Sequence, residues 1–177
     1  MFERYRYTEI EQKKLLNSIK IIIDTQEKVN NHITDYFDKH KILYINKALD
    51  SGDYSFFLPK NEELSIPKDL YFHEDIFIER KNSTGELAGS FSQTRTRFES
   101  EFLRSPAKKK YLLLENAEYG DIIKHNYEND YSVKSYLGSL HSFNHKYNLE
   151  IVFMPDKNYS APFIYGTFQY YLRNIIK

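Results

Sequence analysis

The chain has no cysteine and no tryptophan among its 177 residues. Without cysteine, disulfide bonds and thiolate metal sites are excluded, and a reducing compartment is favoured. Long apolar runs are also missing, because no run approaches the roughly 20 residues of a membrane span. The first residues, MFERYRYTEIEQKK, carry too many charges for a secretory signal. These absences predict a cytoplasmic protein.

An excess of charge of either sign is absent as well. The 25 Lys and Arg residues balance 25 Asp and Glu residues. No global basic field draws such a chain to nucleic acid, so any site for a polyanion must depend on local charge. What is abundant is aromatic: 16 Tyr and 13 Phe residues predict a largely aromatic core. The length indicates one domain with a substantial core.

Hydrophobic spacing predicts the secondary structure. Strands are expected at 19–24, 42–49, 52–59, 75–81, 108–116 and 149–154, several of them as continuous apolar runs typical of buried strands. Helices are expected at 8–19, 30–41, 86–104, 130–147 and 162–176. The segment 61–74 is expected to be a polar connection, without secondary structure of its own, between two strands. The alternation predicts an α/β domain with a central mixed β-sheet flanked by α-helices.

Three charged residues, Glu79, Arg80 and Lys81, end the strand expected at 75–81. Side chains alternate along a strand, so Glu79 and Lys81 share one face and Arg80 points to the other. Asp53 opens the preceding strand, and a hairpin-like return of the chain would bring it beside Glu79. Two carboxylates and a lysine together can bind Mg²⁺ and support hydrolysis of a phosphodiester.

Asp24 and Glu27, after the first buried strand, supply further carboxylates at the same edge of the expected sheet. Taken alone, this pattern is weak, because an Asp followed by Glu-x-Lys occurs by chance in most chains. The alternative is a surface ion pair at a strand end.

The order of four segments makes the chain resemble the nuclease domain of the XPF-type structure-selective endonucleases, in the restriction-endonuclease-like superfamily. The segments are IIIDTQE (21–27), SGDYSF (51–56), FIERK (77–81) and ELAGSF with TRTRF (86–98). The resemblance implies a restriction-endonuclease-like nuclease fold over residues 20–177. A helical extension would occupy residues 1–19, and the helix-hairpin-helix modules of larger members are not expected.

The resemblance also implies an activity and roles for five acidic or basic residues. It implies an endodeoxyribonuclease that depends on Mg²⁺ or Mn²⁺. Asp53 and Glu79 would be metal ligands, and Lys81 the catalytic lysine. Asp24 would be an auxiliary acid that also faces the metal, and Glu27 the acid that closes the first motif.

Contacts to DNA are expected from five basic residues: Arg80, Arg95, Arg97, Lys108 and Lys109. Alternatives remain open for each group. Arg80 can instead brace the strand in an internal ion pair. One of the two helical arginines is expected to face the cleft while the other braces the core, because residues two apart on a helix do not point the same way. The lysines can instead lie in solvent at the end of a helix, where positive charge is favourable.

Two departures from the family pattern stand out. Gln26 occupies a position where the family usually has Arg or His. Gly85 occupies the position usually held by an Asp, and Glu86 directly precedes Leu87, as that Asp usually precedes a Leu. A one-residue insertion with Glu86 as the auxiliary acid accounts for this spacing.

The expected substrate is branched DNA, and the expected setting is replication, recombination or repair. A small free-standing domain resembles those of bacteriophages, which would place it in the cytoplasm of a bacterial host. The late helices would pair with a second copy or a partner subunit. Two alternatives stay open: a non-catalytic DNA-binding or scaffold subunit, and an exonuclease or restriction-type enzyme of the same superfamily.

Overall fold

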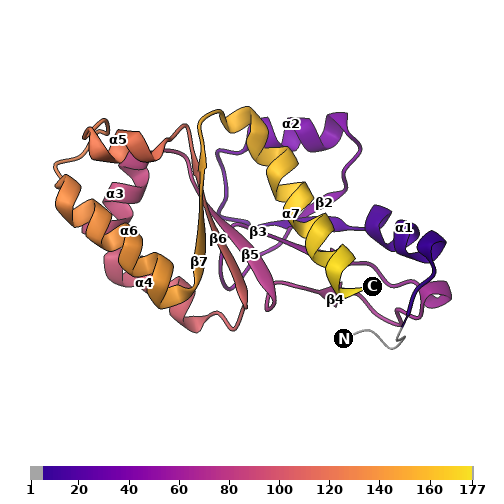
Figure 1. Ribbon diagram of the computed structural model, residues 1–177. Coiled ribbons are helices and arrows are strands. Elements are labelled where there is room, and N and C mark those ends of the chain that lie inside the picture. The colour runs from indigo at the N-terminus through magenta and orange to yellow at the C-terminus, as the bar shows by residue number, and fades with distance from the viewer. Residues whose placement is uncertain (1–5, 177) are drawn as a thin grey trace.

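The computed structural model describes residues 6–176 and confirms the α/β class (Figure 1). One mixed sheet has the strand order β2-β1-β3-β5-β6-β7, with β4 paired to β3. The strands are β1 (Lys20–Ile23), β2 (Tyr44–Asn46), β3 (Tyr54–Leu58), β4 (Leu70–Tyr71), β5 (Ile76–Lys81), β6 (Lys109–Glu115) and β7 (Leu149–Met154). Strands β5, β6 and β7 are parallel, whereas β3 runs antiparallel to both β1 and β5.

Three helices cover one face of the sheet: α1 (Glu9–Asn17), α2 (Asn31–Lys39) and α7 (Ser160–Ile175). Their apolar side chains share a core with Ile21, Phe56 and Ile78 of the sheet. The ring of Phe56 lies 5.3 Å from that of Phe168 in α7. The N-terminal helix is therefore part of this core, which it enters through the fully buried Leu15.

The other face carries α3 (Thr84–Ser92), α4 (Arg95–Arg104), α5 (Tyr119–Ile123) and α6 (Val133–Tyr147). Aromatic rings dominate its core, as the composition predicts. Phe98 stacks on Phe143 at 5.4 Å, and Phe91 lies 4.9 Å from the same ring. None of the helices in residues 6–176 is long and apolar enough to cross a membrane.

The single helix expected at 86–104 is wrong, because the structure has two helices with a break at Gln93 and Thr94. The amides of both residues donate to the carbonyl of Gly89, at 2.8 and 3.3 Å, which ends α3. A new helix then starts when the Phe98 amide bonds to the Thr94 carbonyl. The polar connection expected at 61–74 has secondary structure of its own, since β4 and a 3₁₀ turn at Glu62–Leu64 lie within it. Helix α5 was not expected.

Strand β5 lies inside the sheet, between β3 and β6, and carries the charged residues to its end. The alternation predicted for it is confirmed. Ile76 and Ile78 belong to the core under α2 and α7, whereas Phe77 belongs to the core under α3, α4 and α6. Ser83 caps α3 directly after the strand, because its hydroxyl accepts a hydrogen bond from the Glu86 amide at 3.1 Å.

Candidate active site

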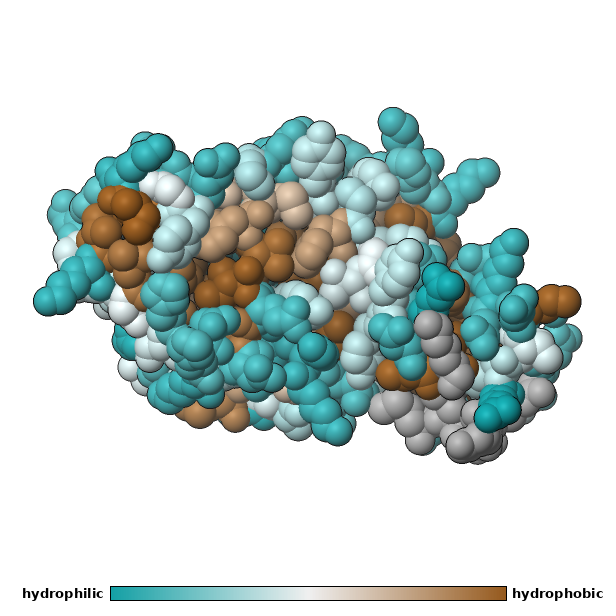
Figure 2. Space-filling model, viewed as in Figure 1, coloured by the Kyte–Doolittle hydropathy of each residue, from teal (hydrophilic) through white to brown (hydrophobic). Residues whose placement is uncertain are grey.

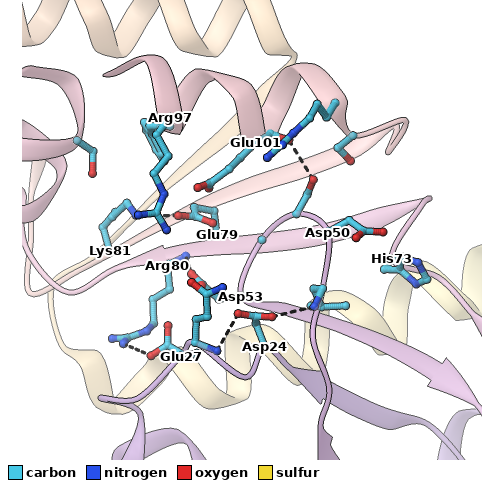
Figure 3. Close-up of a pocket in the computed structure, with 18 of the residues that line it drawn as sticks. Asp24, Glu27, Asp50, Asp53, His73, Glu79, Arg80, Lys81, Arg97 and Glu101 are labelled. Atoms are coloured by element: carbon cyan, nitrogen blue, oxygen red, sulfur yellow. Dashed lines mark hydrogen bonds and ion pairs between the residues drawn. The ribbon is translucent and has the colours of Figure 1, made fainter. Parts of the chain in front are cut away.

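A cleft with a volume of about 1140 Å³ opens at the charged end of β5 (Figure 3). Its walls come from the loop after β1, the loop before β3, the end of β5, and helices α3 and α4. The cleft is lined mostly by polar atoms of charged residues, five of which lie between Asp24 and Asp53. Such a lining is suited to an ionic ligand rather than to an apolar small molecule.

Asp53 is fixed to β5 by its own backbone and by its side chain. Its amide donates to the carbonyl of Ile78 at 2.9 Å, and its Oδ2 accepts a hydrogen bond from the Arg80 amide at 2.7 Å. Tyr54, the next residue, pairs with Ile78 in the sheet. The return that the sequence predicts is therefore present, and it sets the Asp53 carboxylate beside Glu79.

A glycine permits the approach of the loop that carries Asp53. Gly52 has φ of +72°, in the left-handed region that residues with a Cβ rarely adopt. A Cβ built at this position would lie 2.2 Å from Cδ2 of Phe77. Only glycine lets the loop cross the Phe77 ring so closely.

Glu79 and Lys81 lie on the face of β5 that points toward α3 and α4, as period two predicts. Lys81 Nζ is 2.7 Å from Glu79 Oε1 and lies 4.8 Å from the centre of the Phe98 ring. The side chains of Lys81 and Glu79 are almost buried, at 13% and 6% exposure. Burial opposes the charge of Lys81, but the attraction of Glu79 outweighs it and raises the pKa of the lysine. Lys81 therefore stays an ammonium group.

The acidic side chains of the cleft crowd one another. Burial, followed by the negative charges of Glu79 and Glu27, raises the pKa of Asp53 well above its ordinary value. Burial and Glu79 raise the pKa of Glu101 to about 7. Carboxylates that repel in this way favour a cation between them.

A divalent cation of the Mg²⁺ type fits this donor set. Such an ion keeps several waters and needs only one or two carboxylates from the protein. Asp53 and Glu79 supply two. Within the described residues, no three Asp, Glu or His side chains are grouped closely enough to enclose an ion on their own.

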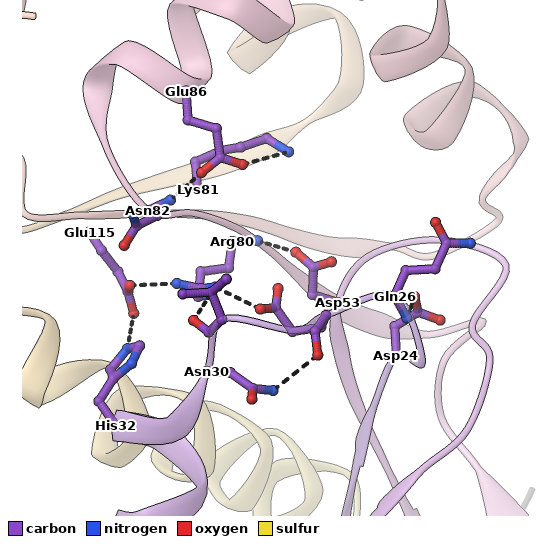
Figure 4. Close-up of polar contacts among 12 residues, drawn as sticks. Asp24, Gln26, Asn30, His32, Asp53, Arg80, Lys81, Asn82, Glu86 and Glu115 are labelled. Atoms are coloured by element: carbon purple, nitrogen blue, oxygen red, sulfur yellow. Dashed lines mark hydrogen bonds and ion pairs between the residues drawn. The ribbon is translucent and has the colours of Figure 1, made fainter. Parts of the chain in front are cut away.

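Arg80 points to the opposite face of β5 and lies in a buried ion-pair network (Figure 4). Its guanidinium donates to Glu115 Oε2 and to Glu27 Oε1, both at 2.6 Å, and to the carbonyl of Val29 at 2.9 Å. His32 Nε2 lies 2.8 Å from the other oxygen of Glu115. The side chain of Arg80 is 4% exposed. The Arg80 guanidinium is thus buried in ion pairs and is not exposed for the expected contact to DNA. The structure instead shows the alternative, an internal ion pair that braces the strand.

Glu27 and Asp24 both hold protein groups in this arrangement. Glu27 is the partner of Arg80, with a side chain that is 8% exposed. Asp24 accepts hydrogen bonds from the amides of Gln26 and Leu49, at 2.9 and 2.8 Å, one to each carboxylate oxygen. Asp24 therefore joins two loops of the cleft wall, and its part in binding a metal stays a prediction.

The two arginines expected on one helix point in different directions, because α4 carries them two positions apart. Arg97 lines the cleft (Figure 3). Arg95 turns away and donates to Ser139 Oγ at 2.6 Å, with its guanidinium 5.2 Å from the centre of the Phe143 ring. Arg97 is thus the arginine available to a ligand in the cleft.

The two lysines expected to bind DNA lie outside the cleft. Lys109 begins β6 and pairs with Glu150 of β7 at 2.8 Å. Lys108 is exposed just before that strand. Because the charged end of β5 lies beside the other end of β6, neither lysine lines the cleft.

The acid that follows the signature segment stands on the cleft side of α3. Glu86 lines the cleft, where its Oε2 accepts a hydrogen bond from the Asn82 amide at 2.8 Å and its Oε1 lies 3.9 Å from Lys81 Nζ. Gly85 faces the other way, since a Cβ built there would lie 3.6 Å from backbone atoms of Glu128. The geometry is consistent with the expectation that Glu86, and not position 85, is the acid directed to the cleft.

Two side chains that belong to the cleft or to the ion-pair network beside it were missed in the sequence. Glu115 ends strand β6, whose last four residues are buried, and a charge at the end of such an apolar run is a detectable signal. Glu101 lines the cleft from α4, one helical turn after Arg97. Its position could not be predicted without the break between α3 and α4.

Comparison with known proteins identifies a family and a fold. A family model described as the ERCC4 domain matches residues 23–167. Solved structures of XPF from Aeropyrum pernix match with TM-scores of 0.59 and, for a complex with DNA, 0.60. The matches have 16% and 14% sequence identity and cover 85% and 88% of this chain.

The same matches cover 65% and 66% of the two XPF chains, so this chain spans slightly less than two thirds of their length. At such low identity the likeness shows the fold, which is restriction-endonuclease-like. No curated protein sequence matches the chain.

Proposed function

The chain belongs to the ERCC4 domain family, and on this premise we propose that it is a metal-dependent endonuclease that cuts branched DNA. The proposed substrates are forks, flaps and junctions, which arise in replication, recombination and repair. The observation that carries the proposal is the pairing of β3 with β5, which sets Asp53 beside Glu79 and Lys81 in one cleft.

In this proposal Asp53 and Glu79 hold a Mg²⁺ or Mn²⁺ ion. When bound, such an ion lowers the pKa of a coordinated water and neutralises charge on the phosphoryl oxygens. Lys81 is kept as an ammonium group by Glu79 and by the nearby Phe98 ring. Its fixed positive charge would stabilise the negative charge that develops on the phosphate.

Basic residues on the cleft wall support a polyanion as ligand. Lys28, Arg97 and Arg104 line the cleft, although the chain as a whole carries no net charge. Contacts of such residues to phosphates position a nucleic acid without reading its sequence. One of the matching XPF structures is a complex with DNA, which supports DNA as the polyanion.

The test is cleavage of end-labelled forks, flaps, four-way junctions and linear duplex in the presence of Mg²⁺. The wild type should cut the branched substrates at discrete internal positions. Lys81→Ala should cut them about 10²- to 10³-fold more slowly, the usual cost of removing a group that stabilises the transition state. Lys109→Ala is the matched control, because this lysine lies outside the cleft. Equal rates for wild type and Lys81→Ala would remove the proposed mechanism.

Circular DNA separates the endonuclease from an exonuclease of the same superfamily. An enzyme that needs an end cannot cut a closed circle, whereas an endonuclease can. Circular single-stranded DNA and covalently closed circular duplex DNA therefore belong in the same panel.

A second candidate function is a non-catalytic DNA-binding subunit. Two observations favour it: Gly85 offers no carboxylate, and each oxygen of Asp24 already accepts a backbone hydrogen bond. Such a subunit should bind branched DNA without cutting it. It should also show no rise in Tm with Mg²⁺, whereas an ion that binds the folded state must raise Tm.

We also propose that the domain pairs with a second copy or a partner subunit. Tyr159 and Tyr170, before and within α7, are 63% and 60% exposed. Figure 2 shows apolar side chains gathered in the region of the edge strand β7, whose residues Ile151–Met154 are half-buried. The mass in solution, measured by light scattering at several concentrations, tests the pairing: a monomer at all concentrations would contradict a homodimer.

A further inference from the structure

Helix α4 presents a polar stripe to the cleft. Arg97, Glu101 and Arg104 are four and three positions apart, which places them on one face of a helix, and all three line the cleft. The adjoining stripe of the helix, Phe98 and Phe102, packs into the core, and Phe98 also lines the cleft. The break at residues 93–94 determines which side of α4 faces the cleft, because α4 begins as a separate helix after it.

Glu101 is the acidic member of this stripe, and its carboxylate points toward Glu79 (Figure 3). This carboxylate makes no hydrogen bond and no ion pair with any other residue in the part of the chain that the structure describes. The backbone carbonyl of Glu101 accepts a hydrogen bond from Ser51 Oγ at 3.0 Å. Ser51 lies in the loop that carries Asp53, so helix and loop are tied together at the site.

Helix α3 does not offer an equally free carboxylate. Gly85 has no side chain and faces the backbone of Glu128. Glu86 caps the Asn82 amide with one oxygen and places the other near Lys81. The unpaired acid beside Glu79 therefore comes from α4.

We propose that Glu101 is a third carboxylate of the cation site, acting from α4 beside Asp53 and Glu79. The inference rests on the proposed function, because it requires that the cleft binds a divalent cation. An ion of the Mg²⁺ type keeps part of its water shell, so a third acid can act by accepting hydrogen bonds from those waters. Such partners orient the ligands of an ion and strengthen its binding. Glu101 also repels Glu79, and a cation between them relieves this repulsion.

Binding of Mn²⁺ alone, measured by isothermal titration calorimetry without DNA, tests the proposal. Glu101→Gln should weaken Mn²⁺ binding about 10- to 100-fold, the range found for supporting groups around metal sites. Glu99→Gln is the matched control on the same helix, since Glu99 accepts a hydrogen bond from Tyr147 and does not line the cleft. Unchanged Mn²⁺ affinity in Glu101→Gln would overturn the proposal.

Further variants separate this inference from the function on which it rests. Glu79→Gln should abolish Mn²⁺ binding. If the wild type binds no Mn²⁺, or Glu79→Gln binds it as the wild type does, the metal-dependent function itself fails. If Glu79→Gln loses binding while Glu101→Gln keeps it, only the role of Glu101 fails.

Stability separates a loss of binding from a loss of the fold. Glu101→Gln is nearly isosteric and removes a repulsive charge, so its Tm without metal should equal or exceed that of the wild type. Glu101→Asp keeps the charge and should bind Mn²⁺ with an affinity between those of the wild type and Glu101→Gln. Affinity for Mn²⁺ in Glu101→Asp below that of Glu101→Gln would contradict a role for the charge.

Discussion

The amide of Arg80 donates a hydrogen bond of 2.7 Å to the carboxylate of Asp53, which directly precedes the neighbouring strand β3. A backbone donor fixes this carboxylate whatever side chain residue 80 carries. The next residue back, Glu79, then has its own carboxylate beside that of Asp53. The GDY and ERK segments thus meet because β3 pairs with β5 in the register that sets Tyr54 opposite Ile78.

Gly52→Ala should destabilise the protein by about 2–4 kcal/mol. An alanine at this position must keep the left-handed backbone conformation, and its Cβ must displace the Phe77 ring; both effects cost free energy. The free energy of unfolding, from urea denaturation followed by circular dichroism, measures this change. Gly138→Ala in α6 is the control, because its Cβ would meet no other described atom within 4 Å, and it should be neutral or stabilising. A Gly52→Ala protein as stable as the wild type would contradict the close crossing.

Arg80→Ala should lower the free energy of unfolding by about 3–5 kcal/mol, because it leaves Glu27 and Glu115 buried without their partner. Urea denaturation of the variant and the wild type measures the loss. Arg97→Ala removes the same charge from the open cleft and should change stability by less than about 0.5 kcal/mol. A loss for Arg80→Ala as small as that for Arg97→Ala would show that the network contributes little.

Arg97 and Arg95 should differ in their effect on DNA binding. Arg97→Ala should weaken binding of a flap substrate and reduce the slope of log K against log salt by about one unit, as the loss of one phosphate contact does. Arg95→Ala should leave that slope unchanged, since Arg95 bonds to Ser139 outside the cleft. Fluorescence anisotropy at several salt concentrations measures both slopes. Equal slopes for Arg97→Ala and the wild type would argue against a phosphate contact.

Without divalent ions, stability should fall as pH rises through neutrality. Burial and Glu79 raise the pKa of Glu101 to about 7 in the folded protein, so between its ordinary value and pH 7 the folded state holds a proton that the unfolded state has lost. The free energy of unfolding therefore declines over this interval, and Asp53, whose pKa is also raised, acts in the same direction. After allowance for the partial exposure of Glu101, the decline that it causes is about 1–2 kcal/mol.

Urea denaturation in EDTA at pH 5 and pH 8 measures the decline. Glu101→Gln should lose its share of it, because the amide does not titrate. Added Mg²⁺ should stabilise the wild type more at pH 8 than at pH 5, since protons compete for the same carboxylates. A wild-type protein that becomes more stable from pH 5 to pH 8 in EDTA would contradict the assigned direction of both pKa shifts.

The sequence allowed the local part of the site to be predicted. Period two along β5 correctly separates Glu79 and Lys81 from Arg80, because alternation is a property of the strand itself. The return of Asp53 could also be expected, since β3 and β5 are close in the chain and pair directly.

Features that depend on tertiary contacts could not be predicted. The partners of Arg80 are Glu27 and Glu115, which lie far from it in the chain and meet only when β1, β5 and β6 assemble. The break between α3 and α4 has no proline to mark it, and Phe91 and Phe98 keep helical spacing across it because both helices face one core. The rotation of α4, and with it the place of Glu101, follows from that break.

Cleavage of a labelled flap substrate by Glu79→Gln in Mg²⁺ tests most directly whether Glu79 binds a catalytic metal ion. If Glu79 holds the ion, this variant should keep the circular dichroism spectrum and DNA affinity of the wild type, and both the variant in Mg²⁺ and the wild type in EDTA should fail to cut. Cleavage by Glu79→Gln at the wild-type rate would contradict a metal-dependent active site at Glu79.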